Sequence, residues 1–237
     1  MRVILLAAGL GTRLAPITDT LPKCLVPING KPLLDYWIEQ LFNAGIERIL
    51  INTHYLREQV EKHVENSEYV NRIDLVYEKE LLLTGGTVLC NKDFINDQPF
   101  LLVHADNLSF CDFSAFIKAH YARPSGTEIT MMTFVTDTPQ SCGIVEVDAD
   151  GVVIDFHEKK ESPPSSMANA AVYIIEPSVV HTMVSMGKNK IDFSLDVIPQ
   201  FLGKINTFHN DNYHRDIGTL ASYGLAQIEC LKILNIS

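Results

Sequence analysis

The chain begins with an apolar run that leads directly into a glycine turn. Residues Val3–Ala8 are apolar at every position, and Gly9 and Gly11 follow with only Leu10 between them. An uninterrupted apolar run of this length is typical of a strand buried on both faces, as in a parallel sheet covered by helices. Glycines at the end of such a strand let the backbone turn tightly and present N–H groups to a phosphate. We therefore expect an α/β fold whose first β-to-α loop binds an anion.

Apolar runs and helical spacings alternate through the first half of the chain. Further strands are predicted at Ile49–Thr53, Ile73–Tyr77 and Phe100–Val103. Helices are predicted at Leu33–Ala44 and Leu56–Val64, between the strands. This β-α-β-α-β order predicts a parallel sheet that binds ligands outside the carboxyl ends of its strands.

The second half is richer in β-structure, and no linker separates it from the first. Its predicted elements are strands at Ile129–Val135, Gly143–Val147, Val152–His157 and Ala170–Ile175, a hairpin turn at Asp148–Gly151, and helices at Asp192–Leu202 and Thr219–Leu234. We therefore expect a single domain over residues 1–237, in which one continuous sheet joins a half of about residues 1–125 to a half of about residues 126–237.

The charge balance narrows the partners that the chain can have. Lys and Arg number 19 against 29 Asp and Glu, which gives a formal charge of −10. A general nucleic-acid binder needs a surplus of cations to neutralise phosphates, so this class is excluded, whereas a small anion held by local donors is not. No apolar stretch approaches the roughly 20 residues of a membrane span.

Cysteine usage and the N-terminus indicate the compartment. The five cysteines are scattered and never have C-x-x-C spacing, which favours reduced thiols over a disulfide framework or a structural zinc site. The apolar start ends at Gly9 and is followed by Arg13, without a cleavage site. We therefore expect a soluble, cytoplasmic protein without a signal peptide.

The glycine turn continues into a longer motif. It reads Gly9-x-Gly11-Thr12-Arg13-Leu14-x-Pro16, followed by Pro22-Lys23-x-Leu25-x-Pro27 and then by Lys31-Pro32. A dinucleotide fingerprint would have a third glycine where Leu14 stands, and the chain has no P-loop sequence. Arg13 and Lys23 supply a planar fork and a compact point charge, which together suit a polyphosphate.

This motif closely resembles the signature of the sugar-1-phosphate nucleotidyltransferases. Enzymes of this family condense an NTP with a sugar 1-phosphate and release pyrophosphate and an NDP-sugar. The resemblance implies a Rossmann-like mixed, mainly parallel sheet flanked by helices, with a nucleotide-binding first half and a β-rich sugar-binding portion in the second. It also implies that Arg13 contacts the leaving pyrophosphate and that Lys23 contacts the reacting α-phosphate. The loop residues that would wrap the nucleotide are Ala8, Gly9, Gly11 and Thr12.

Two aspartates stand where this family places its metal ligands. Asp106 follows the apolar strand Phe100–Val103, and Asp216 begins a D-x-G-T sequence. Taken alone, each is more typical of a turn or a helix N-cap, but the resemblance implies that both bind Mg²⁺. The attacking phosphate oxygen is already anionic, so no general base is required. We therefore expect three histidines to be structural or peripheral: His104, His157 and His214.

A glycine pair marks the expected base pocket. Thr84-Gly85-Gly86 matches a glycine turn that lies against the nucleobase in the family, although Leu81–Leu83 replaces the Pro-Leu-Gly that often precedes it. Gly85 and Gly86 would permit close approach to a flat ring. The start of an apolar helix is the alternative interpretation of this segment.

The sugar-side residues follow further along the chain. The resemblance assigns hydrogen bonds with sugar hydroxyls to Gly143, Glu158 and Asn169, and contact with the sugar phosphate to Lys159. The segment after Asn169 commonly has glycine at the second position, where this chain has Ala171. Glu158 and Asn169 favour a polyol over a quaternary amine, for which an aromatic or acidic cage is expected.

The resemblance predicts a Mg²⁺-dependent enzyme whose partners are an NTP and a sugar 1-phosphate. The short chain with its Thr84–Gly86 segment is most similar to mannose- or heptose-1-phosphate guanylyltransferases, which use GTP. Uridylyl- and thymidylyltransferases acting on glucose or amino-sugar 1-phosphates are the first alternative. A choline-phosphate cytidylyltransferase and a catalytically silent sensor of nucleotide sugars follow, but a sensor would be expected to have lost one of the four residues Arg13, Lys23, Asp106 and Asp216. Because the chain has no hexapeptide repeats, we expect no appended acyltransferase. We expect a monomer or homodimer without nucleic-acid or membrane partners.

Overall fold

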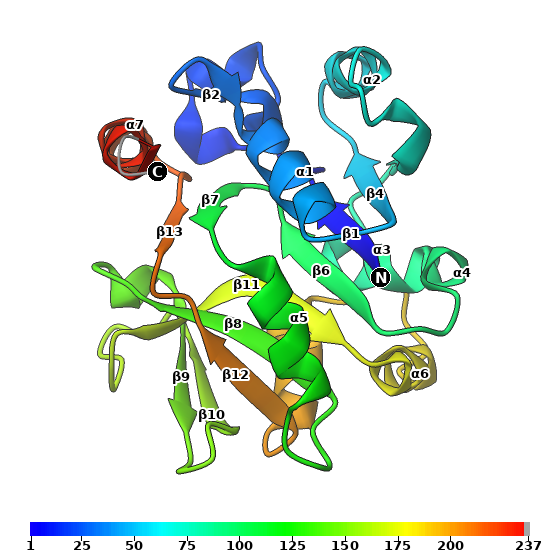
Figure 1. Cartoon of the computed structure of the whole chain (residues 1–237), viewed down its shortest axis with the longest axis vertical. Coiled ribbons are helices and arrows are strands. Elements are labelled where there is room, and N and C mark those ends of the chain that lie inside the picture. The colour runs from blue at the N-terminus through cyan, green and yellow to red at the C-terminus, as the bar shows by residue number, and fades with distance from the viewer. Residues whose placement is uncertain (235–237) are drawn as a thin grey trace.

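A computed structural model describes residues 1–234, and across them a nine-stranded mixed sheet runs through both halves of the chain (Figure 1). In chain order the strands are β1 (Arg2–Leu6), β2 (Pro27–Ile28), β3 (Lys31–Pro32), β4 (Arg48–Thr53), β5 (Ile73–Tyr77), β6 (Phe100–His104), β7 (Asn107–Phe110), β8 (Ile129–Val135), β9 (Gly143–Val147), β10 (Val153–Glu158), β11 (Met167–Ile175), β12 (Ile205–His209) and β13 (Tyr213–Asp216). The order in the sheet is β10-β9-β11-β6-β1-β4-β5, with β8 beside β11 and β12 beside β8. Two small ladders, β7 with β13 and β2 with β3, complete the strands of these residues. The expected α/β class and continuous sheet are confirmed.

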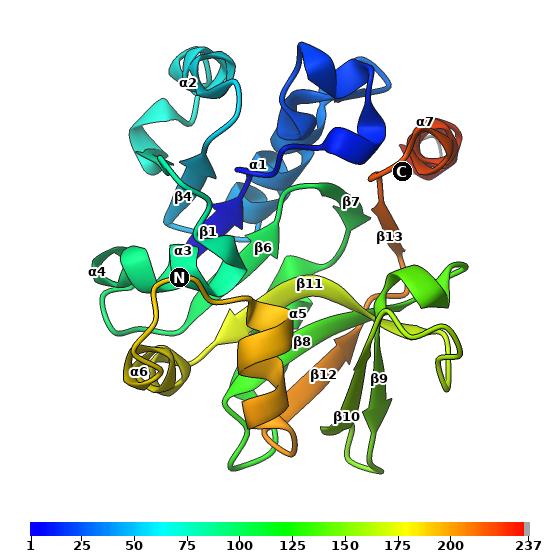
Figure 2. The ribbon, with the colours of Figure 1, turned by 180° about the vertical axis from the view of Figure 1, so that it is seen from behind.

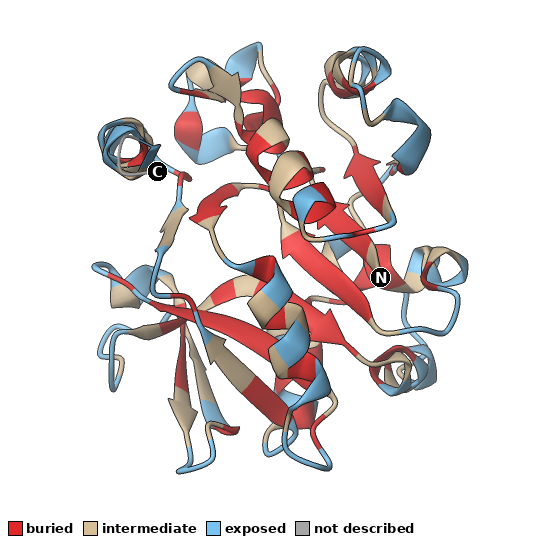
Figure 3. Ribbon diagram, viewed as in Figure 1, coloured by how far each residue is buried: buried red, intermediate tan, exposed pale blue. Residues whose placement is uncertain are grey.

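Helices cover both faces of the sheet. They are α1 (Leu33–Asn43), α2 (Arg57–Glu65), α3 (Leu83–Cys90), α4 (Lys92–Ile95), α5 (Phe113–Tyr121), α6 (Pro177–Ser185) and α7 (Leu220–Leu234). α1 and α5 lie on the face seen in Figure 1, and α3 and α6 lie on the opposite face, seen in Figure 2. A hydrophobic cluster forms under each layer, and Figure 3 shows the buried residues concentrated in the strands between them.

Helix α1 is fixed by its apolar face. Leu34, Trp37 and Leu41 recur at helical spacing and are completely buried. Trp37 also donates its indole N–H to the carbonyl oxygen of Asn107 at 2.8 Å. Because Asn107 begins β7, this hydrogen bond ties α1 to the backbone immediately after Asp106.

The parallel part of the sheet creates a place for ligands. β5, β4, β1 and β6 are mutually parallel, and β4 and β6 flank β1 on opposite sides. In the register of these strands, Leu6 at the end of β1 lies between Asn52 and His104. The winding of the chain therefore reverses at β1, and open α/β sheets bind ligands at the carboxyl ends of the strands at such a point.

Strand β11 joins the two halves. It runs antiparallel to β6 and also pairs with β8 and β9. Its register with β8 shifts between Asn169 and Tyr173, and Ala171 within this bulge has a φ of 55°. Bulges of this kind redirect side chains at the rim of a sheet.

One local prediction is wrong, and one alternative interpretation is confirmed. Residues 192–202 do not form one α-helix, because Phe193–Val197 is a π-helical turn and Ile198–Phe201 is a 3₁₀ turn. Pro199 has no N–H to donate to a carbonyl four residues earlier, so it interrupts an α-helical ladder. Thr84–Gly86 lies in the first turn of α3, as the alternative interpretation of this segment as the start of an apolar helix predicts.

Among residues 1–234, no helix combines the length and the apolar composition that crossing a bilayer requires.

Candidate active site

The glycine loop after β1 packs against Lys23. Gly11 has a φ of 64°, in the left-handed region that favours glycine, and a Cβ added there would lie 3.1 Å from the Cβ of Lys23. Thr12 begins the short 3₁₀ turn that follows. Ala8 and Gly9 line a cavity that Lys23 also lines. The loop and the lysine therefore form one wall of the same site.

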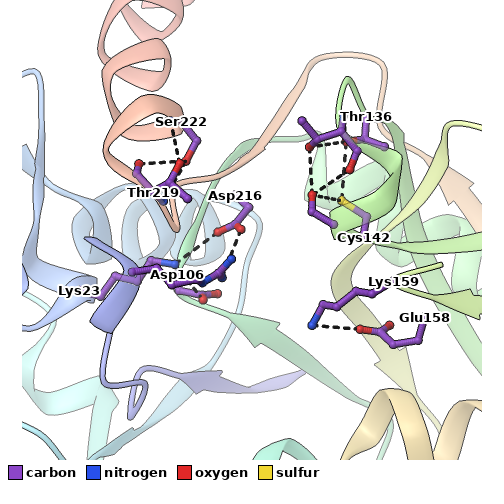
Figure 4. Close-up of polar contacts among 12 residues, drawn as sticks. Lys23, Asp106, Thr136, Cys142, Glu158, Lys159, Asp216, Thr219 and Ser222 are labelled. Carbon is purple, nitrogen blue, oxygen red and sulfur yellow. Dashed lines mark hydrogen bonds and ion pairs between the residues drawn. The ribbon is translucent and has the colours of Figure 1, made fainter. Parts of the chain in front are cut away.

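Lys23 is the centre of a charged cluster (Figure 4). Its Nζ lies 3.0 Å from Oδ2 of Asp106 and 3.3 Å from Oδ1 of Asp216. A second cation, Arg13, places Nη2 at 3.7 Å from Oδ2 of Asp216. Lys23 is only 6% exposed, whereas the Arg13 side chain is 67% exposed. One cation is thus buried between the two aspartates, and the other projects from them into open space.

The pairing of β7 with β13 brings the two aspartates together. Asp106 lies in the short connection between β6 and β7, directly before Asn107. Asn107 is the register partner of Asp216 across the antiparallel ladder. Two residues that are far apart in the sequence therefore reach the same end of the sheet, as the resemblance implies.

The charge and the exposure of the two aspartates suit them to binding a cation. Burial of the Asp106 carboxyl acts to raise its pKa, but the Lys23 ammonium, with His104, holds that pKa below its ordinary range. The side chains of Asp106 and Asp216 remain 44% and 48% exposed. Carboxylate oxygens that are adjacent and accessible fit the hard oxygen donors that Mg²⁺ prefers. Asp106 and Asp216 would hold the divalent ion, and Lys23 already supplies positive charge beside them.

A cavity of about 220 Å³ extends from this cluster along the ends of β1, β4 and β6. Its polar wall is a hydrogen-bonded group of Asn52, Glu78 and Thr87. Oε1 of Glu78 accepts from Nδ2 of Asn52 at 3.0 Å and from Oγ1 of Thr87 at 2.5 Å. Asn52 Oδ1 in turn accepts from the N–H of Ala7 at 2.7 Å. Ala7 directly follows β1, so a side chain replaces the next backbone partner there. Glu78 is only 5% exposed, so its carboxylate is nearly buried where it lines the cavity. Its hydrogen bonds with Asn52 and Thr87 hold it in place.

The sequence analysis missed this group. Asn52 lies at the carboxyl end of β4, and Glu78 directly follows β5. That is the same position after a buried strand that drew attention to Asp106. The end of a buried strand therefore marks Glu78 in the same way as it marks Asp106.

Gly85 and Gly86 have a packing role in α3. A Cβ on Gly85 would lie 2.6 Å from Cγ2 of Ile191, and one on Gly86 would lie 2.5 Å from the carbonyl oxygen of Asn189. Both glycines therefore let α3 approach the segment at 189–191 closely. From the same helix, Leu83 and Thr84 line the cavity. A base contact by Gly85 or Gly86 stays a prediction, and the nearer candidates are these neighbours.

The predicted sugar-side residues lie at the start of β9 and the end of β10. Gly143 and Glu158 are cross-strand partners, and a Cβ on Gly143 would lie 2.8 Å from Oε2 of Glu158 and 2.5 Å from the ring of Phe156. Nζ of Lys159 is 3.2 Å from Oε1 of Glu158. Figure 4 shows this pair on the opposite side of the view from the Lys23 cluster. The structure therefore brings these three predicted residues together.

Asn169 lies in the bulge of β11. Its Nδ2 donates to the Tyr173 hydroxyl at 2.6 Å, and its Oδ1 accepts from the N–H of Ala171 at 2.9 Å. The side chain is thus positioned by the bulge itself, and Ala171 adopts the left-handed backbone that glycine adopts more readily.

A second cavity, of about 560 Å³, begins at Arg13 and Asp216 and reaches the sugar half. Its far wall includes Thr136 and Cys142, whose Oγ1 and Sγ are 3.6 Å apart in a small polar cluster (Figure 4). Because Cys142 directly precedes Gly143, this cavity connects the charged cluster with the sugar side.

Two histidines beside the charged cluster lack hydrogen-bond partners. Within residues 1–234, the buried side-chain nitrogen or oxygen atoms without a partner are Nε2 of His104 and Nδ1 of His214. Burial lowers the pKa of His104, and it lowers that of His214 to about 3. No hydrogen bond within these residues holds the ring of His104, and the expectation that it is structural or peripheral stays a prediction.

Comparisons with known proteins show the family of the chain. A family model described as nucleotidyl transferase matches residues 2–232. Glucose-1-phosphate adenylyltransferase of Thermotoga maritima is 29% identical over 254 residues, and the aligned region covers 95% of this chain and 59% of the relative. Mannose-1-phosphate guanylyltransferase of Mycobacterium tuberculosis is 28% identical over 221 residues, covering 91% of this chain and 60% of its own. The chain thus spans about three-fifths of the length of these relatives.

A solved structure matches over nearly the whole of both chains. HddC from Yersinia pseudotuberculosis is 27% identical and superposes with a TM-score of 0.82, covering 97% of this chain and 99% of its own. The same protein complexed with GMP-PN superposes with a TM-score of 0.81.

Proposed function

The chain belongs to the nucleotidyl transferase family, and from that premise we propose that it transfers a nucleoside monophosphate from an NTP to a sugar 1-phosphate. The products are an NDP-sugar and pyrophosphate. GTP is the proposed nucleotide, with mannose 1-phosphate or a heptose 1-phosphate as the proposed acceptor. Residues of about 1–125 would hold the nucleotide, and residues of about 126–237 would hold the sugar.

The observation that carries the proposal is the position of Lys23 between Asp106 and Asp216. A buried ammonium beside two accessible carboxylates is suited to a group that gains negative charge during reaction, such as the α-phosphate. The exposed guanidinium of Arg13, on the outer side of Asp216, is free to meet a departing pyrophosphate. Mg²⁺ is the proposed ion, and when bound it supplies further neutralisation of phosphate charge.

The reaction needs little else from the protein. The attacking oxygen of a sugar 1-phosphate is ionised at neutral pH, so the site must align it rather than remove a proton. The cavity beside Ala8 and Gly9 would hold the nucleotide, and the Glu158–Lys159 pair lies across from the charged cluster. Catalysis is then a matter of positioning and electrostatic stabilisation.

Glu78 supports guanine as the base. Oε1 of Glu78 already accepts from Asn52 and Thr87. Oε2 accepts from the N–H of Leu82 at 3.3 Å, so Oε2 keeps one acceptor site for a base. Guanine alone among the common bases presents two adjacent donors, N1–H and N2–H₂, on one edge, and either can occupy that site without bringing an acceptor against the carboxylate. Adenine and cytosine pair a donor with an acceptor, and uracil and thymine flank one donor with acceptors. Glu78 lines the cavity next to Thr84 and Thr87. The neighbour complexed with GMP-PN and the guanylyltransferase relative support the same choice.

A pyrophosphate-release assay tests the proposal. Each of the four NTPs is combined with mannose, heptose, glucose and amino-sugar 1-phosphates in the presence of Mg²⁺. We expect turnover that requires a sugar 1-phosphate, with GTP as the preferred nucleotide. A preference for UTP or dTTP would replace the guanylyl assignment with the uridylyl or thymidylyl alternative. Nucleotide-sugar binding without turnover across the whole panel would contradict the proposed activity and favour a sensor.

Two variants serve as internal controls. Asp106→Asn and Asp216→Asn each remove a proposed metal ligand without changing side-chain volume. We expect both to fold, as judged by circular dichroism, and to lose at least about 100-fold in turnover. Near-normal turnover in either variant would contradict the metal assignment.

A further inference from the structure

Nε2 of His104 is a buried polar atom without a partner. A buried donor or acceptor that bonds neither protein nor water destabilises the folded state. His120 shows the usual alternative in this chain, since its Nδ1 is 2.9 Å from Oγ1 of Thr130 and its Nε2 is 3.2 Å from Oε1 of Glu176. A histidine kept for structural reasons would be expected to resemble His120. An unpaired nitrogen beside a cavity instead indicates a group that a ligand satisfies.

His104 stands in the middle of a row across the end of the sheet. Leu6 pairs with Asn52 on one side and with His104 on the other, and residues in register on neighbouring parallel strands point to the same face. On β11, Val172 pairs with Val103, so the bulge that carries Ala171 lies beside His104. The row therefore runs from the Asn52 end, where Glu78 lies, to the end that carries Asn169.

His104 lines the cavity of about 220 Å³ on the side of this row nearest β11, and the groups at the other end of the row already have partners. In the proposed complex, Lys23, Arg13 and the divalent cation already neutralise the phosphates of the NTP. On the base side, Asn52 already uses its amide in bonds to Ala7, Glu78 and Thr87. His104 lies on the β11 side of Leu6, next to the bulge that positions Asn169.

We propose that Nε2 of His104 forms a hydrogen bond with a hydroxyl of the sugar in the sugar 1-phosphate. This inference rests on the proposed function and names a specificity residue within it. A hydroxyl both donates and accepts, so it pairs with Nε2 in either tautomer of the ring. His104 is the last residue of β6, so this bond links the sugar to the strand end that precedes Asp106 by two residues.

The test compares His104→Leu, His104→Gln and His120→Leu with the wild type. His104→Leu removes the unpaired nitrogen, so we expect the melting temperature without substrate to stay the same or to rise by about 2–4 °C. With the sugar 1-phosphate that the wild type prefers, KM for the sugar should rise about 10-fold while KM for the NTP is unchanged. His104→Gln keeps a polar group near Nε2 and should recover most of this loss. His120→Leu should lower the melting temperature and leave the KM for the sugar unchanged.

Deoxy analogues of the sugar 1-phosphate identify the hydroxyl. For the analogue that lacks the contacted hydroxyl, wild type and His104→Leu should have the same kcat/KM, whereas they differ about 10-fold with the parent sugar. A loss of the same size on every analogue would overturn the proposal, and so would a rise in KM for the NTP alone. If His104→Leu does not fold, a wild-type KM for the sugar in His104→Ala and His104→Phe overturns it.

Calorimetric titration separates this proposal from the proposed function. The preferred sugar 1-phosphate is titrated into wild type and into His104→Leu in the presence of Mg²⁺ and without NTP. Weaker binding to His104→Leu supports the proposal even where turnover is slow, and equal binding overturns it. Absence of turnover in the wild type on the whole substrate panel contradicts the proposed function, which is a different result from normal turnover in His104→Leu.

Discussion

Nζ of Lys23 lies 3.3 Å from Oδ1 of Asp216, a residue 193 positions further along the chain. The same nitrogen is 3.0 Å from Oδ2 of Asp106. Lys23 therefore neutralises two carboxylates that would repel one another without a cation between them. In the absence of substrate, the lysine would compete with the proposed divalent ion for the same pair of acids.

This competition gives the first prediction. Lys23→Met should lower turnover at least about 100-fold, because the ammonium no longer stabilises charge on the α-phosphate. The same variant should bind Mg²⁺ more tightly than the wild type when no nucleotide is present, since both carboxylates lose their fixed counter-ion. Isothermal titration with Mg²⁺ checks the second effect.

Lys204→Met is a matched control for Lys23→Met. Lys204 also forms an ion pair, with Oε1 of Glu128 at 2.8 Å, but lies in the loop before β12, away from the charged cluster. This variant should retain wild-type turnover and Mg²⁺ affinity. Weaker Mg²⁺ binding in Lys23→Met than in the wild type would show that the lysine organises the acids rather than competing for them.

Glu78→Gln tests the source of base selectivity. Glutamine replaces one acceptor by a donor, so guanine loses the hydrogen bond that Oε2 can accept from its edge when the amide nitrogen takes that position. We expect kcat/KM for GTP to fall about 10- to 100-fold, with a smaller change for ATP and UTP, so that the preference for GTP shrinks. Initial rates with each NTP at saturating sugar 1-phosphate measure this ratio.

Glu80→Gln makes the same substitution two residues away. Glu80 is exposed and pairs with Lys190 at 3.3 Å, outside the cavity. Its GTP preference should equal that of the wild type. An unchanged ratio of GTP to ATP rates in Glu78→Gln would mean that the base is read elsewhere, for example by the backbone around Thr84.

Ala171→Gly concerns the bulge of β11. Ala171 has a φ of 55°, and the left-handed region costs a residue with a Cβ about 1–2 kcal/mol. Glycine removes that strain but adds freedom to the unfolded chain, so a net gain of about 0.5–1 kcal/mol in the free energy of unfolding is expected. Urea denaturation measures it. Ala170→Gly, at a completely buried neighbour without positive φ, should instead lose stability. A loss of stability in Ala171→Gly would show that its methyl group contributes packing that exceeds the strain.

Most of the sheet was predictable because its strands carry long apolar runs. The end of β6 follows from the run at Phe100–Val103, and the position of Asp106 follows from the end of β6. The glycine that the family commonly has at position 171 also gains a physical explanation, since the bulge requires a left-handed backbone there. Local pattern was therefore sufficient wherever a residue's place depends on its own strand.

Positions that depend on distant packing were not predictable in this way. Gly85 and Gly86 are required by the segment at 189–191, about 100 residues later, and no local pattern indicates that contact. The segment at 192–202 has apolar residues at helical spacing, but Pro199 divides it into two turns. The meeting of Asp106 and Asp216 came from the family signature alone, because it depends on the β7–β13 pairing.

His120 provides a pH-dependent prediction for stability. It is completely buried in α5, and burial, with the nearby charge of Arg123, lowers its pKa from 6.5 to about 4. Glu176 can only accept, so Nε2 carries the proton and Thr130 donates its hydroxyl hydrogen to Nδ1. The unfolded chain therefore takes up a proton near pH 6.5, while the folded protein resists it until about pH 4. Because the unfolded state binds more protons in this interval, the stability from His120 is complete above pH 6.5 and decreases as the pH falls.

The size of this effect follows from the interval. One pKa unit corresponds to about 1.4 kcal/mol, so acidification from pH 7.5 to pH 5 should remove about 2 kcal/mol of the free energy of unfolding through His120 alone. His120→Gln cannot titrate, and its free energy of unfolding should fall by about 2 kcal/mol less than that of the wild type over the same interval. Urea denaturation of both proteins at several pH values measures the difference. His181→Gln, at an exposed histidine that pairs with Asp97 at 3.3 Å, should keep the wild-type pH dependence. Parallel curves for wild type and His120→Gln would mean that His120 becomes protonated in the folded protein as easily as in the unfolded chain, with Glu176 compensating the added charge.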